Sequence, residues 1–332
     1  MEVAQNSCTF IPVRINEHGV ILDPGASSAL RDAMGDSSAA TDLFLFTHGW
    51  WTNASLAMDE AKHFSVEFTN RLLQIASQAP LALRLPASSF ALGIHWPAML
   101  NDNNPRALVN WLEFTTFYTM EKRADVVGEN GVSSLAQIIY RVREHAKGEL
   151  RVHAVAHSFG CRVVCSALCT ALQAVAKEFG AVPGAIRLNV VLLQAAFDHN
   201  YLEREKRYGA LCTPDVPLRL LATRSDEDLA LVRLYRDAER PLHLLSRTSN
   251  LALGAVGPSL KSVADFGGKD DVTVKTGLTY SDVAAKNARL VVADLTPIHR
   301  EYPGRRHAFC GHHSDILSDE IYQLLAGFLF RP

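Results

Sequence analysis

Short apolar runs alternate with amphipathic segments along most of the chain. The runs are almost continuously apolar, which is typical of strands that helices cover on both faces of a parallel sheet. The predicted strands are residues 42–47, 90–95, 151–156, 188–194, 218–223 and 289–295. The predicted helices include residues 57–76, 134–143, 162–179 and 315–330. This alternation predicts an α/β fold, with a mostly parallel, doubly wound sheet and helices on both faces.

Three segments depart from the simple alternation. Residues 9–22 predict a leading antiparallel hairpin or meander that turns at Glu17-His18-Gly19. Residues 97–132 are rich in aromatic side chains, and residues 239–286 are rich in glycine and read as a loop-rich excursion. Neither of the two longer segments has the composition of a flexible linker. We therefore expect a single domain over residues 1–332, with these two insertions forming a cap or lid at one edge of the sheet.

Composition and charge exclude several classes of protein. The chain has 332 residues, of which 48% are apolar, and this apolar fraction argues against a disordered chain. Lys and Arg number 33 against 35 Asp and Glu, so the net charge of −2 gives no support to a nucleic-acid partner. The start of the chain lacks the pattern of a secretory signal, and no apolar stretch reaches the length of a membrane span.

The six cysteines form no C-x-x-C pair. Cys161, Cys165 and Cys169 recur every four residues, which places them on one face of a helix. Small thiols packed in a reduced core explain this spacing better than a metal site, so we expect no metal and no cofactor. A cytoplasmic location is the default expectation for such cysteine usage.

The strongest chemical signal lies at the end of the strand predicted at 151–156. The strand leads into Ala156-His157-Ser158-Phe159-Gly160, and a helix follows at once. This is the G-x-S-x-G nucleophile elbow with alanine in place of the first glycine. Small residues two positions before and after the serine are needed because the strand and helix cross closely there. We predict that Ser158 is a nucleophile and that the turn exposes its hydroxyl.

A serine hydroxyl needs a base, and a carboxylate that orients the base. On this type of fold the chain order is serine, acid and then histidine, so the base is sought near the last helix. His312 and His313 lie between the last predicted strand and that helix. We favour His313, which directly precedes the helix with Ser314 as the predicted N-cap, and keep His312 as the alternative.

The acid is expected after the strand at 218–223, where several carboxylates follow in sequence. Asp228 is the first choice because it stands before an apolar helical start. Asp226 is the second choice. Asp198, which follows the strand at 188–194, is the third.

The segment His48-Gly49-Trp50 follows the first predicted strand, at the position of an oxyanion loop. We assign the two oxyanion donors to the backbone N–H groups of Trp50 and Phe159. His157 is not expected to act as the base, because adjacent side chains in an elbow point away from each other. Four aromatic residues near these segments are assigned to an apolar substrate pocket, although core packing is an equal alternative for the last two: Trp51, His157, Trp96 and Trp111.

These motifs together resemble the α/β-hydrolase superfamily, and most of all a poorly characterised bacterial branch of serine esterases. The resemblance is carried by His48-Gly49-Trp50, Trp96-Pro97, residues 156–160, residues 225–231 and His313-Ser314. It implies that Asp228 is the acid and that His313 is the base. The chain departs from the branch in the long segment 239–286 and in the doubled histidine at 312–313.

The predicted function is therefore a serine hydrolase that cleaves small carboxylic esters through an acyl-enzyme. A carboxylesterase is the first choice. A lipase, thioesterase, lactonase or acyltransferase would use the same triad. The non-enzyme alternative is a binding protein on a hydrolase fold that has lost turnover.

Overall fold

The computed structural model describes residues 9–35, 41–49, 54–78, 88–98, 112–144, 149–179, 186–243, 251–302 and 310–331. Within them, one sheet of eight strands has the order β1-β3-β2-β4-β5-β6-β8-β7, and every pairing is parallel. The strands are β1 (Thr9–Arg14), β2 (Thr41–Thr47), β3 (Ser88–His95), β4 (Leu150–His157), β5 (Ile186–Leu193), β6 (Leu218–Arg224), β7 (Asp270–Thr273) and β8 (Leu290–Asp294). The predicted α/β class is confirmed, and all six predicted strands are present.

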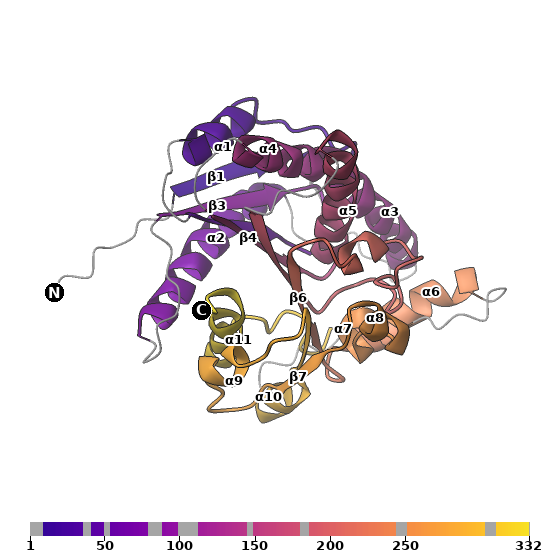
Figure 1. Ribbon diagram of the computed structural model, residues 1–332. Coiled ribbons are helices and arrows are strands. Elements are labelled where there is room, and N and C mark those ends of the chain that lie inside the picture. The colour runs from indigo at the N-terminus through magenta and orange to yellow at the C-terminus, as the bar shows by residue number, and fades with distance from the viewer. Residues whose placement is uncertain are drawn as a thin grey trace.

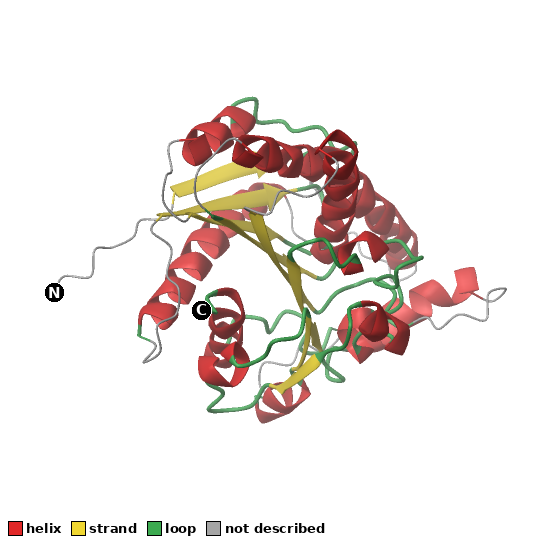
Figure 2. Ribbon diagram, in the orientation of Figure 1, coloured by secondary structure: helices red, strands yellow, loops and turns green. Residues whose placement is uncertain are grey.

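Helices cover both faces of this sheet (Figures 1 and 2). The α-helices are α1 (Ala26–Gly35), α2 (Ala54–Ser77), α3 (Leu112–Val127), α4 (Ser133–Glu144), α5 (Gly160–Phe179), α6 (Arg236–His243), α7 (Leu253–Val256), α8 (Leu260–Asp265), α9 (Tyr280–Ala284), α10 (Thr296–Glu301) and α11 (Asp319–Leu329). In Figure 1, α1, α4 and α5 lie on one side of the sheet, and α2, α9 and α11 lie on the other.

The two layers explain why the strands are continuously apolar. In β2, Leu43 and Leu45 belong to the buried cluster that includes residues of α4 and α5, whereas Phe44 and Phe46 belong to the cluster that includes residues of α2 and α11. Successive side chains of a strand point to opposite faces, so both sets must be apolar.

The start of the chain corrects the predicted hairpin. β1 pairs in parallel with β3 over six residue pairs, from Thr9–Phe90 to Arg14–His95, and so forms an edge of the main sheet. The predicted turn does follow, but the returning chain makes only one antiparallel bridge, between Ile15 and Ile21. The apolar pattern of β1 is compatible with an antiparallel hairpin and with a parallel strand of the main sheet. The pattern alone therefore could not identify β3 as the partner strand.

The two predicted insertions contain regular structure. Residues 97–132 include α3 and a π-helix at Gly128–Val132, and α3 packs on α5 through an ion pair of 2.6 Å between Asp125 and Arg162. Residues 239–286 include α7, α8, α9 and the unpredicted strand β7. β7 reads Asp-Asp-Val-Thr and pairs only with β8, so its polar sequence reflects its place at the edge of the sheet.

The last helix begins later than predicted. α11 starts at Asp319, and the N-cap is Ser318, whose hydroxyl accepts the backbone N–H of Ile321. The predicted cap, Ser314, is therefore wrong. Asp319 and Glu320 stand in the first turn, where they complement the helix dipole, so the stronger start signal lies after Ser318. The residues before it are left to form the loop that carries His313.

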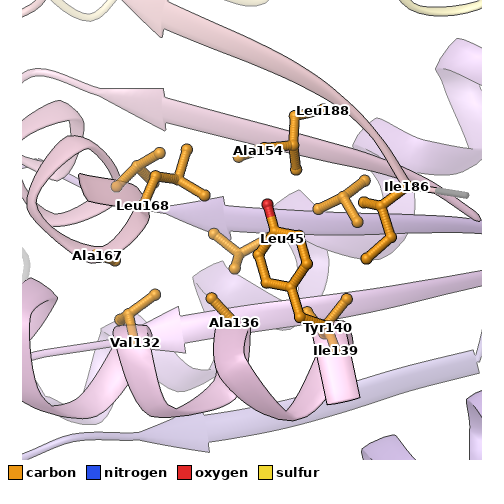
Figure 3. Close-up of a pocket in the computed structure, with 12 residues that line it drawn as sticks. Leu45, Val132, Ala136, Ile139, Tyr140, Ala154, Ala167, Leu168, Ile186 and Leu188 are labelled. Atoms are coloured by element: carbon orange, nitrogen blue, oxygen red, sulfur yellow. The ribbon is translucent and has the colours of Figure 1, made fainter. Parts of the chain in front are cut away.

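The core beside α4 and α5 contains a small apolar cavity of about 20 Å³ (Figure 3). The Tyr140 hydroxyl points into it and makes no hydrogen bond to a described residue. The cysteines of α5 are also buried here, as expected, and burial raises the pKa of Cys169 to about 12. Among the described residues, no helix combines the length and apolar character that crossing a membrane requires.

Candidate active site

Ser158 stands on a strained turn between β4 and α5. Its φ is +55°, a left-handed value that is uncommon for a residue with a side chain. The turn is held on both sides of the residue, because Ser158 N–H donates to the Leu193 carbonyl at 3.0 Å and Ala196 N–H donates to the Ser158 carbonyl at 3.3 Å. A Cβ atom on Gly160 would lie 2.6 Å from the carbonyl oxygens of Thr47 and His48. The small residue is therefore needed for the close approach of α5 to the end of β2.

The side chains of Ser158, His313 and Asp228 form a continuous chain of hydrogen bonds. Nε2 of His313 lies 2.8 Å from Ser158 Oγ, and its Nδ1 lies 2.7 Å from Asp228 Oδ2. The consistent assignment has the serine hydroxyl donating to Nε2 and Nδ1–H donating to the carboxylate. The other oxygen of Asp228 accepts the Leu231 N–H at 3.1 Å, which fixes the orientation of the carboxylate.

The three groups lie below the protein surface. Asp228 is fully buried, and the side chain of His313 is 14% exposed. Ser158 is 4% exposed. Hydrogen bonds between such groups are electrostatically stronger than they would be in water.

The alternatives that the sequence left open make other contacts. The ring of His312 lies 2.6 Å from Asp315 through Nδ1 and stacks on His299 with the ring centroids 5.0 Å apart. Asp198 accepts a hydrogen bond from the Tyr235 hydroxyl at 3.0 Å. Asp226 donates its backbone N–H to the Thr296 hydroxyl at 3.0 Å. The carboxylate that meets Nδ1 of His313 is that of Asp228.

His157 contacts the loop that carries His313 instead of presenting its ring nitrogen to a pocket. Its Nε2–H donates to the backbone carbonyl of His313 at 2.8 Å, and the two ring centroids are 4.8 Å apart. Burial, together with the neighbouring His313, lowers the pKa of His157 to about 3, so its ring is neutral. His157 therefore supports the loop that carries His313, and its assignment to a substrate pocket stays a prediction.

Gln194 is a second support of the loop that carries His313, and it was not predicted from the sequence. It is buried directly after β5 with a φ of +47°, and its Nε2 donates to the His312 carbonyl at 3.0 Å. Its backbone N–H donates to the Thr223 hydroxyl at 2.8 Å. The side chains of His157 and Gln194, at the ends of β4 and β5, therefore hold the consecutive backbone carbonyls of His313 and His312. A glutamine after an apolar strand carries no sequence signal for this role.

The predicted oxyanion loop comes close to the serine. A Cβ atom on Gly49 would lie 2.7 Å from Ser158 Cβ, so glycine is needed for this approach. His48 holds the loop, because its Nδ1–H donates to the Gly49 carbonyl at 2.8 Å. Burial lowers the pKa of His48 to about 4, which keeps the ring neutral. Of the two predicted donors, Phe159 lies at the start of α5, whereas Trp50 lies outside the described residues.

The predicted aromatic pocket is only partly visible. Trp51 and Trp111 lie outside the described residues. Trp96 is fully buried, stacks on His48 and donates its Nε1–H to the His48 carbonyl at 3.2 Å. This is the packing alternative for Trp96, and its buried ring offers no surface to a ligand.

Within the described part of the chain, no group of three or more His, Cys, Asp or Glu side chains is arranged to hold a metal ion. Comparison of the chain with protein-family models, with curated proteins and with solved structures found no match.

Proposed function

We propose that this protein is a serine hydrolase of the α/β-hydrolase type that cleaves carboxylic esters. The observation that carries the proposal is the hydrogen-bonded chain Ser158–His313–Asp228, with distances of 2.8 Å and 2.7 Å. The strained φ of +55° at Ser158 supports it, because strain of this kind persists where the surrounding structure enforces it and is concentrated at functional sites.

In the proposed mechanism, Ser158 Oγ attacks the ester carbonyl while Nε2 of His313 takes its proton. Asp228 holds the imidazole tautomer and stabilises the imidazolium that forms. Backbone N–H groups of Phe159 and Trp50 would receive the negative oxygen of the tetrahedral intermediate. The protonated His313 then donates to the leaving alcohol, and a water molecule cleaves the acyl-enzyme with His313 acting as base again.

The test is covalent labelling with a fluorophosphonate, followed by turnover of p-nitrophenyl acetate, butyrate and octanoate. We expect wild type to be labelled and active, and Ser158→Ala to lose both properties. His313→Ala should lose turnover, whereas His312→Ala should retain turnover above one tenth of the wild-type rate. Labelling that survives in Ser158→Ala would refute the nucleophile.

The same panel separates the proposal from the non-enzyme alternative. A protein that is labelled at Ser158 but turns over none of the three esters would be a binding protein with a reactive serine. Product partitioning when an alcohol acceptor is added would identify an acyltransferase.

A further inference from the structure

A cleft of about 550 Å³ lies at the end of the sheet where the central strands begin, whereas Ser158 lies at the end where they finish. It is lined by residues at or near the first residues of β4, β5, β6 and β8, whereas Ser158 follows the last residue of β4. Its volume falls in the range of small-molecule sites, which is roughly 300–1,000 Å³. Part of the lining is apolar: Leu188, Pro214, Val216, Pro217, Leu218 and Leu329.

The charged residues that line the cleft are all arginines. They are Arg151, Arg187, Arg219, Arg289 and Arg331, and no acidic residue is among the lining residues. This concentration contrasts with the net charge of −2 of the whole chain.

Carboxylates near the cleft neutralise part of this charge. Arg151 pairs with Asp42 at 2.7 Å, and Arg187 pairs with Glu149. Asp270 only partly offsets the lowering of the Arg219 pKa by burial and Arg331, and its Oδ2 already accepts the backbone N–H groups of Asn287 and Ala288.

The other three arginines donate to neutral acceptors. Arg219 donates to the carbonyls of Phe328 and Lys286, and Arg331 donates to the Lys286 carbonyl and the Asn287 side chain. The donors of Arg289 reach several backbone carbonyls, the nearest being that of Thr213 at 2.9 Å. Carbonyls satisfy the donors but do not cancel the charges.

The guanidinium groups are held at an electrostatic cost. Burial and the nearby Arg331 lower the pKa of Arg219 to about 10. Arg151 is almost fully buried, and its Nη1 donates to no described residue. A multivalent anion in the cleft would relieve the repulsion between these groups, and guanidinium groups match phosphate geometry well.

We propose that this cleft binds a small phosphate-bearing molecule, with its phosphate groups against Arg187, Arg219 and Arg331. The apolar lining residues would contact a non-polar or planar part of the ligand. The site is separate from the proposed esterase site, because the two lie at opposite ends of the strands. Binding is therefore expected to be independent of Ser158.

The probes are ATP, inorganic pyrophosphate and adenosine, titrated calorimetrically into the full chain at low ionic strength. We expect ATP and pyrophosphate to bind wild type and Ser158→Ala equally, and adenosine alone not to bind. Tighter binding of ATP than of pyrophosphate would assign the cleft to phosphorylated molecules with a non-polar part. Equal binding would assign it to free polyphosphate anions. Both results support an anion site.

The decisive variant is Arg187→Glu, because the Arg187 side chain is 66% exposed and its replacement leaves the core intact. We expect the affinity for pyrophosphate to fall at least tenfold, and Arg331→Ser to give a loss in the same direction. Arg31→Glu, which makes the same charge reversal at an exposed arginine on α1, is the matched control and should bind as wild type does. The proposal is overturned if neither anion binds wild type, or if binding to Arg187→Glu equals binding to the control.

Discussion

The imidazole of His157 donates from Nε2 to the backbone carbonyl of His313, 2.8 Å away. The residue before Ser158 therefore holds the main chain of the residue whose ring lies against the Ser158 hydroxyl. Burial and the neighbouring His313 lower the pKa of His157 to about 3, so the donor is a neutral ring. This contact links the end of β4 directly to the loop between β8 and α11.

His157→Phe tests this link, because it keeps a ring against His313 and removes the N–H donor. A neutral hydrogen bond contributes about 1 kcal/mol, so we expect kcat for p-nitrophenyl butyrate to fall about fivefold. KM should change little, since the substrate does not contact this bond. His157→Gln retains a donor at a similar distance and should recover most of the rate. Equal rates for the phenylalanine and glutamine variants would show that packing alone matters.

Gly49→Ala tests the approach of the oxyanion loop to the serine. The added Cβ would lie 2.7 Å from Ser158 Cβ and 3.3 Å from its Oγ, so either the loop or the nucleophile must shift. A misplacement of about 1 Å at a reacting group can cost about 100-fold, and we expect a fall of this order in kcat/KM.

Gly25→Ala is the control for that substitution. Gly25 has no heavy atom within 4 Å of an added Cβ, so its activity should stay within twofold of wild type. The readout is ester hydrolysis beside a thermal melt of each variant. An active Gly49→Ala enzyme would mean that the loop does not abut the nucleophile during the reaction.

Asp228→Asn tests the choice of acid. The asparagine amide can donate to Nδ1 of His313, which favours the tautomer that cannot accept the serine proton. We expect kcat to fall by about 10³ to 10⁴ while the fold is retained. Asp226→Asn, two residues earlier in the same loop, should stay within threefold of wild type. A strong loss in Asp226→Asn with an active Asp228→Asn would reverse the assignment.

The sequence could predict those parts of the site that depend on local pattern and chain order. The elbow needs small residues on either side of Ser158, and Ala156 and Gly160 stand two positions before and two positions after it. Asp228 was chosen from its place after the strand at 218–223 and before an apolar helical start. His313 was chosen because it directly precedes the last predicted helix, although that helix begins later than predicted. The structure brings these first choices together, and their catalytic roles remain predictions.

The remainder depends on contacts between distant segments, and no short pattern carries them. Gln194 is defined by its φ of +47° and by a hydrogen bond to a carbonyl 118 residues later in the chain. The arginine cleft joins residues from Arg151 to Arg331, none of which forms a charged run. β7 was missed because a polar edge strand has no apolar pattern, and Ser314 was misassigned because Ser318 competes for the same helix.

Glu239 gives a prediction about stability and pH. It is a buried residue of α6. Burial together with Glu121 and Asp198 raises its pKa to about 8, and the nearby Arg162 acts in the opposite direction. The folded protein then holds a proton that the unfolded chain releases near pH 4.5. Between about pH 4.5 and pH 8 this group makes the free energy of unfolding decrease as pH rises, by at most about 1.4 kcal/mol per unit. Above the folded pKa its contribution is constant.

Glu239→Gln removes this titration while keeping the shape of the side chain. We expect the variant to be more stable than wild type at pH 8, and the difference between them to shrink at pH 5, as measured by urea unfolding at both values. Glu205→Gln, at an exposed position, is the control and should follow wild type at both pH values. A Glu239→Gln variant that is less stable than wild type at pH 8 would show that the carboxylate is held ionised by Arg162, and that its negative charge stabilises the folded protein.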